Sequence, residues 1–222
     1  MSEIVNVFDL KNPFISQTMD RNGFYKEQIS YYKENWVAQK AVEVVNIFLF
    51  NESWELILQK RSSHKGHNAN LIDKSIGGHI VNWDNADFTA MIESVQELKV
   101  PSIVLNTHQD FLKTYLLLNT YLSSTAIIEH IDTKITTNSK IINWEEIVIA
   151  NKTHFYIWVY WWSVKNVDKE AKGILFYSLE ELKEELEAFP DTFTQDMHYY
   201  MKDYTNYFES FLAIIKSKGE EK

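Results

Sequence analysis

Two carboxylates and an amide on one predicted helix are the side chains of this sequence best suited to chemistry. Residues 86–99 (ADFTAMIESVQELK) have helical spacing, with apolar side chains on one side and Glu93, Gln96 and Glu97 on the opposite side. Side chains four residues apart in a helix are neighbours, so Glu93 and Glu97 can reach one cation, with Gln96 as a neutral oxygen ligand. Such ligands suit Mg2+, which often binds through one or two carboxylates plus substrate phosphates. The alternative is an ordinary solvated helix face, because glutamates at this spacing are common there.

The elements around this helix predict an α+β fold. Runs rich in β-branched and aromatic residues indicate strands, and apolar residues at helical spacing indicate helices. Strands are predicted over 41–51, 55–61, 73–76, 153–164 and 173–178, and helices over 24–36, 86–99, 108–123, 179–188 and 195–217. The spacing of Ser178 and Glu181 is typical of a capping box that begins the fourth of these helices. We therefore expect a mixed sheet with helices on both faces, whereas residues 1–23 are not assigned.

Composition limits the functions that this chain can have. The chain has 222 residues and a net charge of −9, so it lacks the overall positive field that draws proteins to nucleic acid or anionic lipid. It has no cysteine, which excludes disulfides, cysteine zinc sites and thiol nucleophiles. Its first residues do not resemble a signal peptide, and its longest apolar runs are too short to span a membrane. We expect one cytoplasmic domain.

The glycine turn and the helix together resemble the Nudix family. The family motif is G-x5-E-x7-R-E-U-x-E-E-x-G-U, where U is a bulky aliphatic residue, and from Gly78 this chain reads GHIVNWDNADFTAMIESVQELKV. Gly78, Glu93, Glu97 and Val100 match the motif, and Asp84 stands at the first glutamate. The segments LILQKRS, DKSIGGHI and YSLEELKEELEAFPDTFTQD are also similar to the Nudix subgroup related to isopentenyl diphosphate isomerase. The resemblance implies a Nudix-type α/β/α sandwich with a mixed sheet, with a core over about 40–190 of residues 1–222, an N-terminal extension and a long C-terminal helix.

The sequence departs from the family motif at five positions. The arginine that normally pairs with the glutamates is Ile92, and one metal-binding glutamate is Gln96. Ser94 stands at an aliphatic position. Lys99 replaces the final glycine, and Trp83 occupies the place of the glycine before the first glutamate.

The resemblance implies hydrolysis of a small diphosphate-linked substrate, such as a nucleoside diphosphate derivative, with Mg2+ or Mn2+. Glu93 and Glu97 would be the catalytic residues, and together with Gln96 they would hold the metal, with Glu97 activating the water. Lys60 and Arg61 would contact the phosphates. The backbone of residues 77–78 (Gly77 and Gly78) would approach the diphosphate closely because no side chain blocks it.

Two other functions remain open at this point. A Nudix-fold module that binds a nucleotide or a protein without catalysis is favoured by Ile92 and Gln96. Isopentenyl diphosphate isomerase activity is less favoured, because Gly77 stands where those enzymes have a cysteine. His79 matches one of their metal-binding histidines, but the strand before NESW holds no equivalents of their upstream metal histidines.

Several other features have two interpretations each. His64 and His67 lie in a polar loop at a spacing that allows a metal, but no third ligand is evident. The aromatic run at 155–162 is typical of a buried strand, with base stacking as the alternative. The apolar stripe of the terminal helix is expected to pack against the domain, with a homodimer partner as the alternative.

Overall fold

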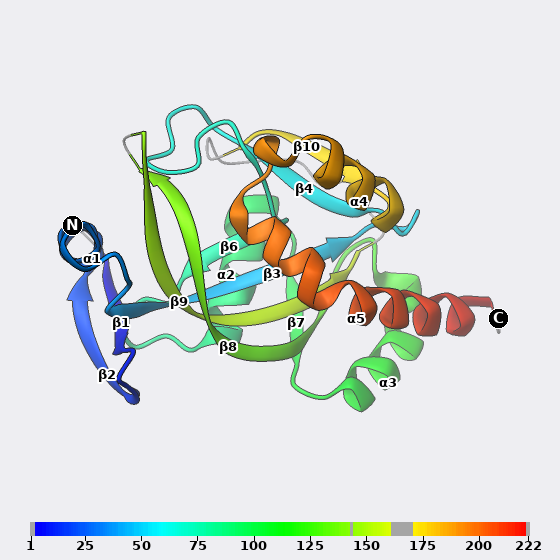
Figure 1. Cartoon of the computed structure of the whole chain (residues 1–222). Coiled ribbons are helices and arrows are strands. Elements are labelled where there is room, and N and C mark those ends of the chain that lie inside the picture. The colour runs from blue at the N-terminus through cyan, green and yellow to red at the C-terminus, as the bar shows by residue number, and fades with distance from the viewer. Residues whose placement is uncertain (1–2, 143, 161–170, 221–222) are drawn as a thin grey trace.

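The computed structural model describes residues 3–142, 144–160 and 171–220 (Figure 1). The elements in chain order are β1 (Ile4–Asp9), β2 (Asn12–Asp20), α1 (Arg21–Asn35), β3 (Lys40–Phe50), β4 (Leu56–Arg61), β5 (Ile72–Asp73), β6 (Ile76–His79), α2 (Ala86–Leu98), β7 (Ser102–Leu105), α3 (His108–Leu118), η1 (Asn119–Tyr121), β8 (Ala126–Ile142), β9 (Glu145–Val159), β10 (Ala171–Tyr177), α4 (Leu179–Ala188), η2 (Pro190–Thr192) and α5 (Gln195–Glu220). The unassigned N-terminal residues form the hairpin of β1 and β2. Part of the strand predicted over 153–164, residues 161–164, lies outside the described residues.

The strands form one mixed sheet around β3. Strand β3 pairs in parallel with β9, and antiparallel with β1, β4 and β6. The main path of the sheet runs β10-β4-β3-β9-β8-β7, and β7 and β8 form a second parallel pair. The predicted mixed sheet of an α+β fold is therefore confirmed.

Helices cover both faces of this sheet, which explains why β3 is apolar along nearly its whole length. Successive side chains of a strand point to opposite faces. Phe48 and Phe50 enter a core formed with α3, α4 and α5, whereas Ile47 and Leu49 enter a second core formed with α2. In Figure 1, α5 crosses the near face of the sheet and α2 lies behind it. The expected α/β/α sandwich is confirmed.

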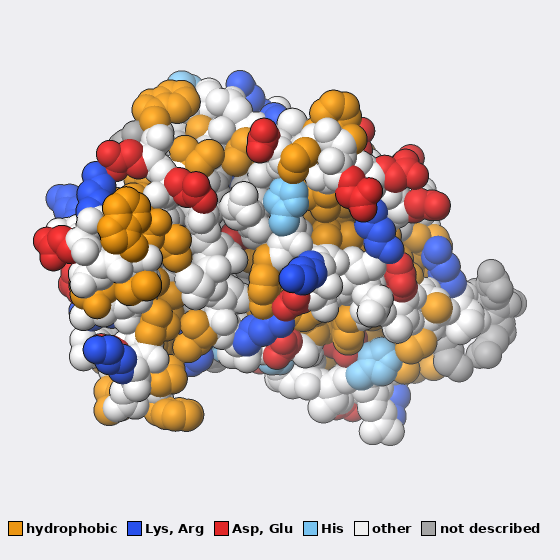
Figure 2. Space-filling view, viewed as in Figure 1, with side chains coloured by type: hydrophobic (Ala, Val, Ile, Leu, Met, Phe, Trp, Pro, Cys, Tyr) orange, Lys and Arg blue, Asp and Glu red, His pale blue; other side chains and the backbone are white. Residues whose placement is uncertain are grey.

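The two aromatic segments belong to these cores. Residues 155–159 of β9 are fully buried, which confirms that this run is a core strand. The α5 stripe, including Tyr200, Phe208 and Phe211, is buried against the sheet as expected. The capping box of α4 is also present, with the Ser178 hydroxyl accepting from the Glu181 amide and the Glu181 carboxylate accepting from the Ser178 amide. Figure 2 shows acidic side chains gathered over α4, whose outer face carries several exposed glutamates.

Helix α2 has a different buried face from the one its apolar spacing indicates. Phe88, Ile92 and Val95 are 44%, 37% and 42% exposed, whereas Ser94 and Glu97 are buried. The helix lies over the glycine backbone of β6 and the polar end of β4. Its inward face combines the apolar Ala90 and Leu98 with the polar Ser94 and Glu97.

The long hairpin of β8 and β9 extends beyond the rest of the sheet and brings a distant segment beside the β4–β5 loop. The backbone amide of Asn68 donates to the Ile141 carbonyl at 3.1 Å, and the Ile141 amide donates to Oδ1 of Asn68 at 2.9 Å. These bonds fix the end of β8 against the loop that follows Arg61. Among the described residues, no helix has the length and apolar content needed to cross a membrane.

Candidate functional site

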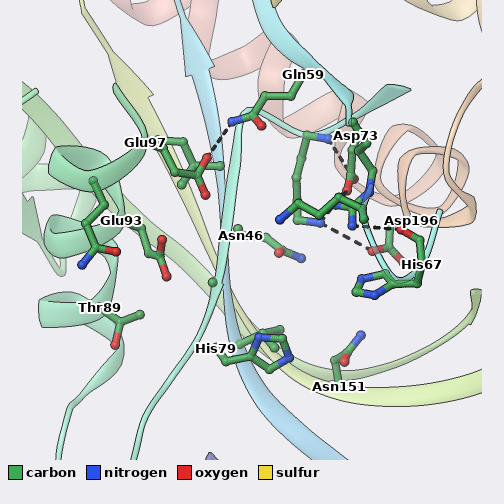
Figure 3. Close-up of a pocket in the computed structure, with 18 of the residues that line it drawn as sticks. Asn46, Gln59, His67, Asp73, His79, Thr89, Glu93, Glu97, Asn151 and Asp196 are labelled. Atoms are coloured by element: carbon green, nitrogen blue, oxygen red, sulfur yellow. Dashed lines mark hydrogen bonds and ion pairs between the residues drawn. The ribbon is translucent and has the colours of Figure 1, made fainter. Parts of the chain in front are cut away.

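A cavity of about 350 Å³ lies between α2, the glycines of β6, the polar end of β4 and the far end of β8 (Figure 3). The predicted site residues that line it are Arg61, Gly77, Gly78, Glu93, Gln96 and Glu97, and Asp84 lines it as well. Lys60 is not among the lining residues. It alternates along β4 with Gln59 and Arg61, which both line the cavity, so its side chain leaves the strand on the other face.

Glu97 is the most deeply placed of the α2 carboxylates, with an exposed fraction of 6%. Its Oε2 accepts a hydrogen bond from Nε2 of Gln59 at 2.6 Å (Figure 3). The same Gln59 nitrogen donates to the carbonyl of Ser75 at 2.5 Å, which fixes the amide in place. Gln59 therefore orients the Glu97 carboxylate from the sheet side, and Ile92 stands at the position of the motif's arginine. Gln59 was not among the residues predicted from the sequence. The one feature that could have indicated it is its position two residues before Arg61, which places both side chains on the same face of the strand.

Glu93 lies against the backbone of Gly78. A Cβ atom built on Gly78 would stand 1.8 Å from Oε1 of Glu93 and 2.3 Å from its Cδ. Only glycine leaves space for this carboxylate, so the turn and the helix are matched to each other. Gly77 likewise leaves space for a neighbouring side chain, because a Cβ atom built on it would stand 2.5 Å from Cε of Lys74.

Two departures from the family motif occupy backbone conformations that favour glycine. Trp83 has φ of 83° and Lys99 has φ of 59°, both in the left-handed region. Lys99 is the C-cap of α2, and its amide donates to the carbonyls of Ser94 and Val95. The backbone therefore keeps the turns at the positions where the motif has glycines, although the side chains differ.

The wall opposite α2 carries an ion-pair network. Arg61 bonds Asp73 at 3.0 Å and the carbonyl of His67 at 3.1 Å, and Lys74 lies 3.3 Å from Asp73 and 3.6 Å from Asp196. Burial alone would raise the pKa of Asp73, but the charges of Lys74 and Arg61 outweigh it and hold that pKa below its ordinary value. Asp73 therefore stays ionised and fixes both cations at the cavity.

Two neutral histidines line the same cavity. Burial, followed by the charges of Lys140 and Arg61, lowers the pKa of His67 to about 2. Burial and four nearby cations lower the pKa of His79 well below its ordinary value. The Nε2 atom of His79 lies 2.9 Å from the Tyr25 hydroxyl, and the rings of Tyr25 and His67 are stacked at 6.1 Å. His64 is exposed and does not line the cavity.

The α2 donors suit a hard cation that is shared with a phosphorylated ligand. Within the part of the chain that the structure describes, no three His, Asp or Glu side chains are grouped closely enough to hold a metal by themselves. Glu93, Glu97 and Gln96 nevertheless offer oxygen atoms on one cavity wall, and Glu93 is seated by Gly78. Mg2+ often completes such a partial set with substrate phosphates. The residues therefore fit a metal that binds together with its substrate.

Comparisons with known proteins concern the fold. No family model matches the sequence, and no curated protein matches it. A crystal structure of DR0079 from Deinococcus radiodurans aligns with a TM-score of 0.55 at 14% identity, over 90% of this chain and 98% of that one. A bifunctional NMN adenylyltransferase/ADP ribose pyrophosphatase from Francisella tularensis, solved with AMP and a manganese ion, has a TM-score of 0.48 at 12% identity, over 84% of this chain and 47% of that one.

A NUDIX family hydrolase from Clostridium perfringens has a TM-score of 0.41 at 17% identity, over 64% of this chain and 84% of that one. Identities this low do not carry an activity from one protein to another. The match to the Deinococcus radiodurans protein establishes a shared fold, a mixed sheet between helices, and the chemistry has to be argued from the residues of this chain.

Proposed function

We propose that this protein is a Nudix-type hydrolase that cleaves a small diphosphate-linked substrate, such as a nucleoside diphosphate derivative, with a divalent metal. One observation carries the proposal: the carboxylate of Glu93 occupies the space that a side chain on Gly78 would fill. That arrangement joins the glycine strand and the acidic helix at one cavity. Gly78 and Glu93 both match the motif of the family that the sequence resembles.

Glu93 and Glu97, with Gln96, would hold Mg2+ or Mn2+ together with the substrate. The ion would neutralise charge on the diphosphate and favour ionisation of a bound water. Glu97 is the best placed to take a proton from the attacking water, because Gln59 fixes its carboxylate at 2.6 Å. The backbone of Gly77 and Gly78 would lie along the diphosphate.

Arg61 is the cation of the second strand that we retain as a phosphate contact. Its Nε atom is buried without a protein hydrogen-bond partner, while its other nitrogens bond Asp73 and the His67 carbonyl. A guanidinium held in this way is already oriented, so it would bind a phosphate oxygen with little loss of side-chain entropy. In the hydrolysis, the water oxygen would form a bond to one phosphorus atom while the bond from that atom to the bridging oxygen breaks. The bridging oxygen would leave with the other phosphate, and the proton of the water would pass to Glu97 and then to solvent or the leaving phosphate.

A binding module is the second candidate. Ile92 and Gln96 remove one positive and one negative charge from the family motif, and the described residues hold no preassembled metal cluster. Such a module would bind a nucleotide in the cavity without turnover and without a metal.

A hydrolysis screen distinguishes these functions. The wild-type protein and Glu97→Gln would be incubated with nucleoside triphosphates, nucleotide sugars, dinucleoside polyphosphates, NADH and prenyl diphosphates, each with Mg2+ and with Mn2+. We expect turnover of at least one class by the wild type and a loss of at least a hundredfold in the variant. Equal turnover by both proteins would exclude Glu97 as the catalytic carboxylate, and no turnover by the wild type would favour the binding module.

A further inference from the structure

A buried lysine far along the chain from the α2 glutamates has no role in the site described so far. Lys140 lies near the end of β8 and is 7% exposed, yet it lines the cavity. It reaches the cavity because the β4–β5 loop is bonded to the neighbouring Ile141.

The ammonium group of Lys140 has no carboxylate partner among the described residues. Its contact is the ring of Tyr25, whose centroid lies 5.7 Å from Nζ. Three other cations around the cavity differ in this respect: Arg21 bonds Glu3 at 2.7 Å, Arg61 bonds Asp73 at 3.0 Å, and Lys74 lies 3.3 Å from Asp73. The stem of Lys140 is buried while the residue lines the cavity, so an anion that enters the cavity would supply the counter-ion that this ammonium group does not have among the described residues.

The groups beside Lys140 are suited to such an anion. The charge of Lys140 acts on both His67 and His79, which are neutral. Neutral imidazoles offer N–H donors without adding charge. In Figure 3, His67 and His79 lie on the side of the pocket away from Glu93 and Glu97.

We propose that Lys140 forms a second anion subsite, which binds a phosphate group of the substrate other than the diphosphate that is cleaved at α2. This inference rests on the proposed function and narrows its substrate class to nucleotide derivatives that carry a further phosphate. His67 and His79 border the subsite.

Binding of inorganic phosphate without metal tests the subsite directly. Isothermal titration of the wild type would be compared with Lys140→Met, with Lys140→Arg and with Lys113→Met, which removes an exposed lysine of α3 and makes the same change in net charge. We expect phosphate affinity to fall at least tenfold in Lys140→Met and to stay within twofold in the other two variants. Equal affinity in the wild type and Lys140→Met would overturn the subsite.

Turnover separates the failure of this inference from that of the proposed function. For each compound that is hydrolysed, the analogue with one more phosphate would be measured, such as NADPH beside NADH. We expect Lys140→Met to raise KM at least tenfold for the more phosphorylated member alone. If Lys140→Met leaves the KM of both compounds of a pair unchanged while Glu97→Gln abolishes turnover, the subsite is wrong and the hydrolase stands. If no compound is hydrolysed but phosphate binding depends on Lys140, the hydrolase is wrong and the anion site stands.

Discussion

At the scale of single residues, the site depends on side chains that fit one another closely. Glu93 requires the absence of a side chain at Gly78, and Glu97 is oriented by Gln59. The sequence indicates Gly78, Glu93 and Glu97, but it does not indicate Gln59 or either contact. Each can be removed by a single substitution that leaves the two cores unchanged.

Gly78→Ala is expected to displace Glu93, because the new methyl group would overlap its carboxylate. The overlapped atoms are the end of a flexible side chain, so the cost should appear in activity more than in stability. We predict at least a hundredfold loss of metal-dependent turnover with a melting temperature close to that of the wild type. Gly173→Ala is the matched control, since its Cβ would meet no atom within 4 Å. A fully active Gly78→Ala variant would refute the seating of Glu93.

Gln59→Met would remove the hydrogen bond to Glu97 while keeping a side chain of similar length. Loss of a group that orients a metal ligand typically costs roughly 10–100-fold in activity or metal affinity. We predict that kcat falls by this factor and that KM changes little, because Gln59 positions a carboxylate and does not hold substrate. Gln109→Met, on the exposed side of α3, should leave both constants unchanged. A rise in KM with kcat unchanged would instead indicate that Gln59 contacts the substrate.

At the scale of elements, helix α2 shows what local sequence can and cannot predict. Its existence and its approximate limits follow from residue spacing, which predicts a helix over 86–99, and in the structure Asn85 caps its start and Lys99 its end. The face that α2 buries does not follow from local sequence, because the glycine strand beneath the helix decides it. Hydrophobicity favours burying Phe88 and Ile92, yet the side chains that α2 buries include Ala90, Ser94, Glu97 and Leu98.

Lys99→Gly is predicted to stabilise the protein by about 1 kcal/mol, because a non-glycine residue at positive φ is strained. Urea unfolding would measure the change. Lys113→Gly, inside α3, should instead destabilise the protein by about 1 kcal/mol, because glycine weakens a helix interior. If Lys99→Gly lowers stability, the left-handed turn at the end of α2 is wrong.

At the scale of the whole molecule, long-range contacts set what the sequence could not predict. The apolar patterns of β3, β9 and α5 are strong over short stretches of sequence. They therefore predicted that both faces of the sheet are covered. Lys140 enters the cavity only because the β8–β9 hairpin reaches the β4–β5 loop, and no local pattern in residues 101–150 indicates that contact. The family resemblance located Glu93 and Glu97 but not the side chains that support them.

Glu43 ties three strands together and makes the fold sensitive to acid. Its carboxylate accepts from Asn6 of β1 and from Lys152 and His154 of β9, each at 3.0 Å. Burial raises the pKa of Glu43, but these hydrogen bonds outweigh it and lower the pKa to about 2. The stabilisation is therefore complete above about pH 4.5 and is lost as the pH falls towards 2.

Glu43→Gln should accordingly cost about 2 kcal/mol of unfolding free energy at pH 7. The difference from the wild type should shrink as the pH falls from 5 to 2.5, which urea titrations at each pH would measure. Glu146→Gln, which neutralises an exposed glutamate near the start of β9, should show no such trend. A difference that stays constant with pH would show that Glu43 is not ionised in the folded protein.

The central claim is that Glu93 and Glu97 bind a divalent metal jointly with a diphosphate. Electron paramagnetic resonance measures it directly, by titrating Mn2+ into the protein with and without a non-hydrolysable methylene diphosphonate nucleotide. We predict that the wild type binds one Mn2+ at least tenfold more tightly with the nucleotide present, and that Glu97→Gln loses this enhancement. Equal Mn2+ binding by the wild type and the variant in the presence of the nucleotide would show that Glu97 does not hold the metal.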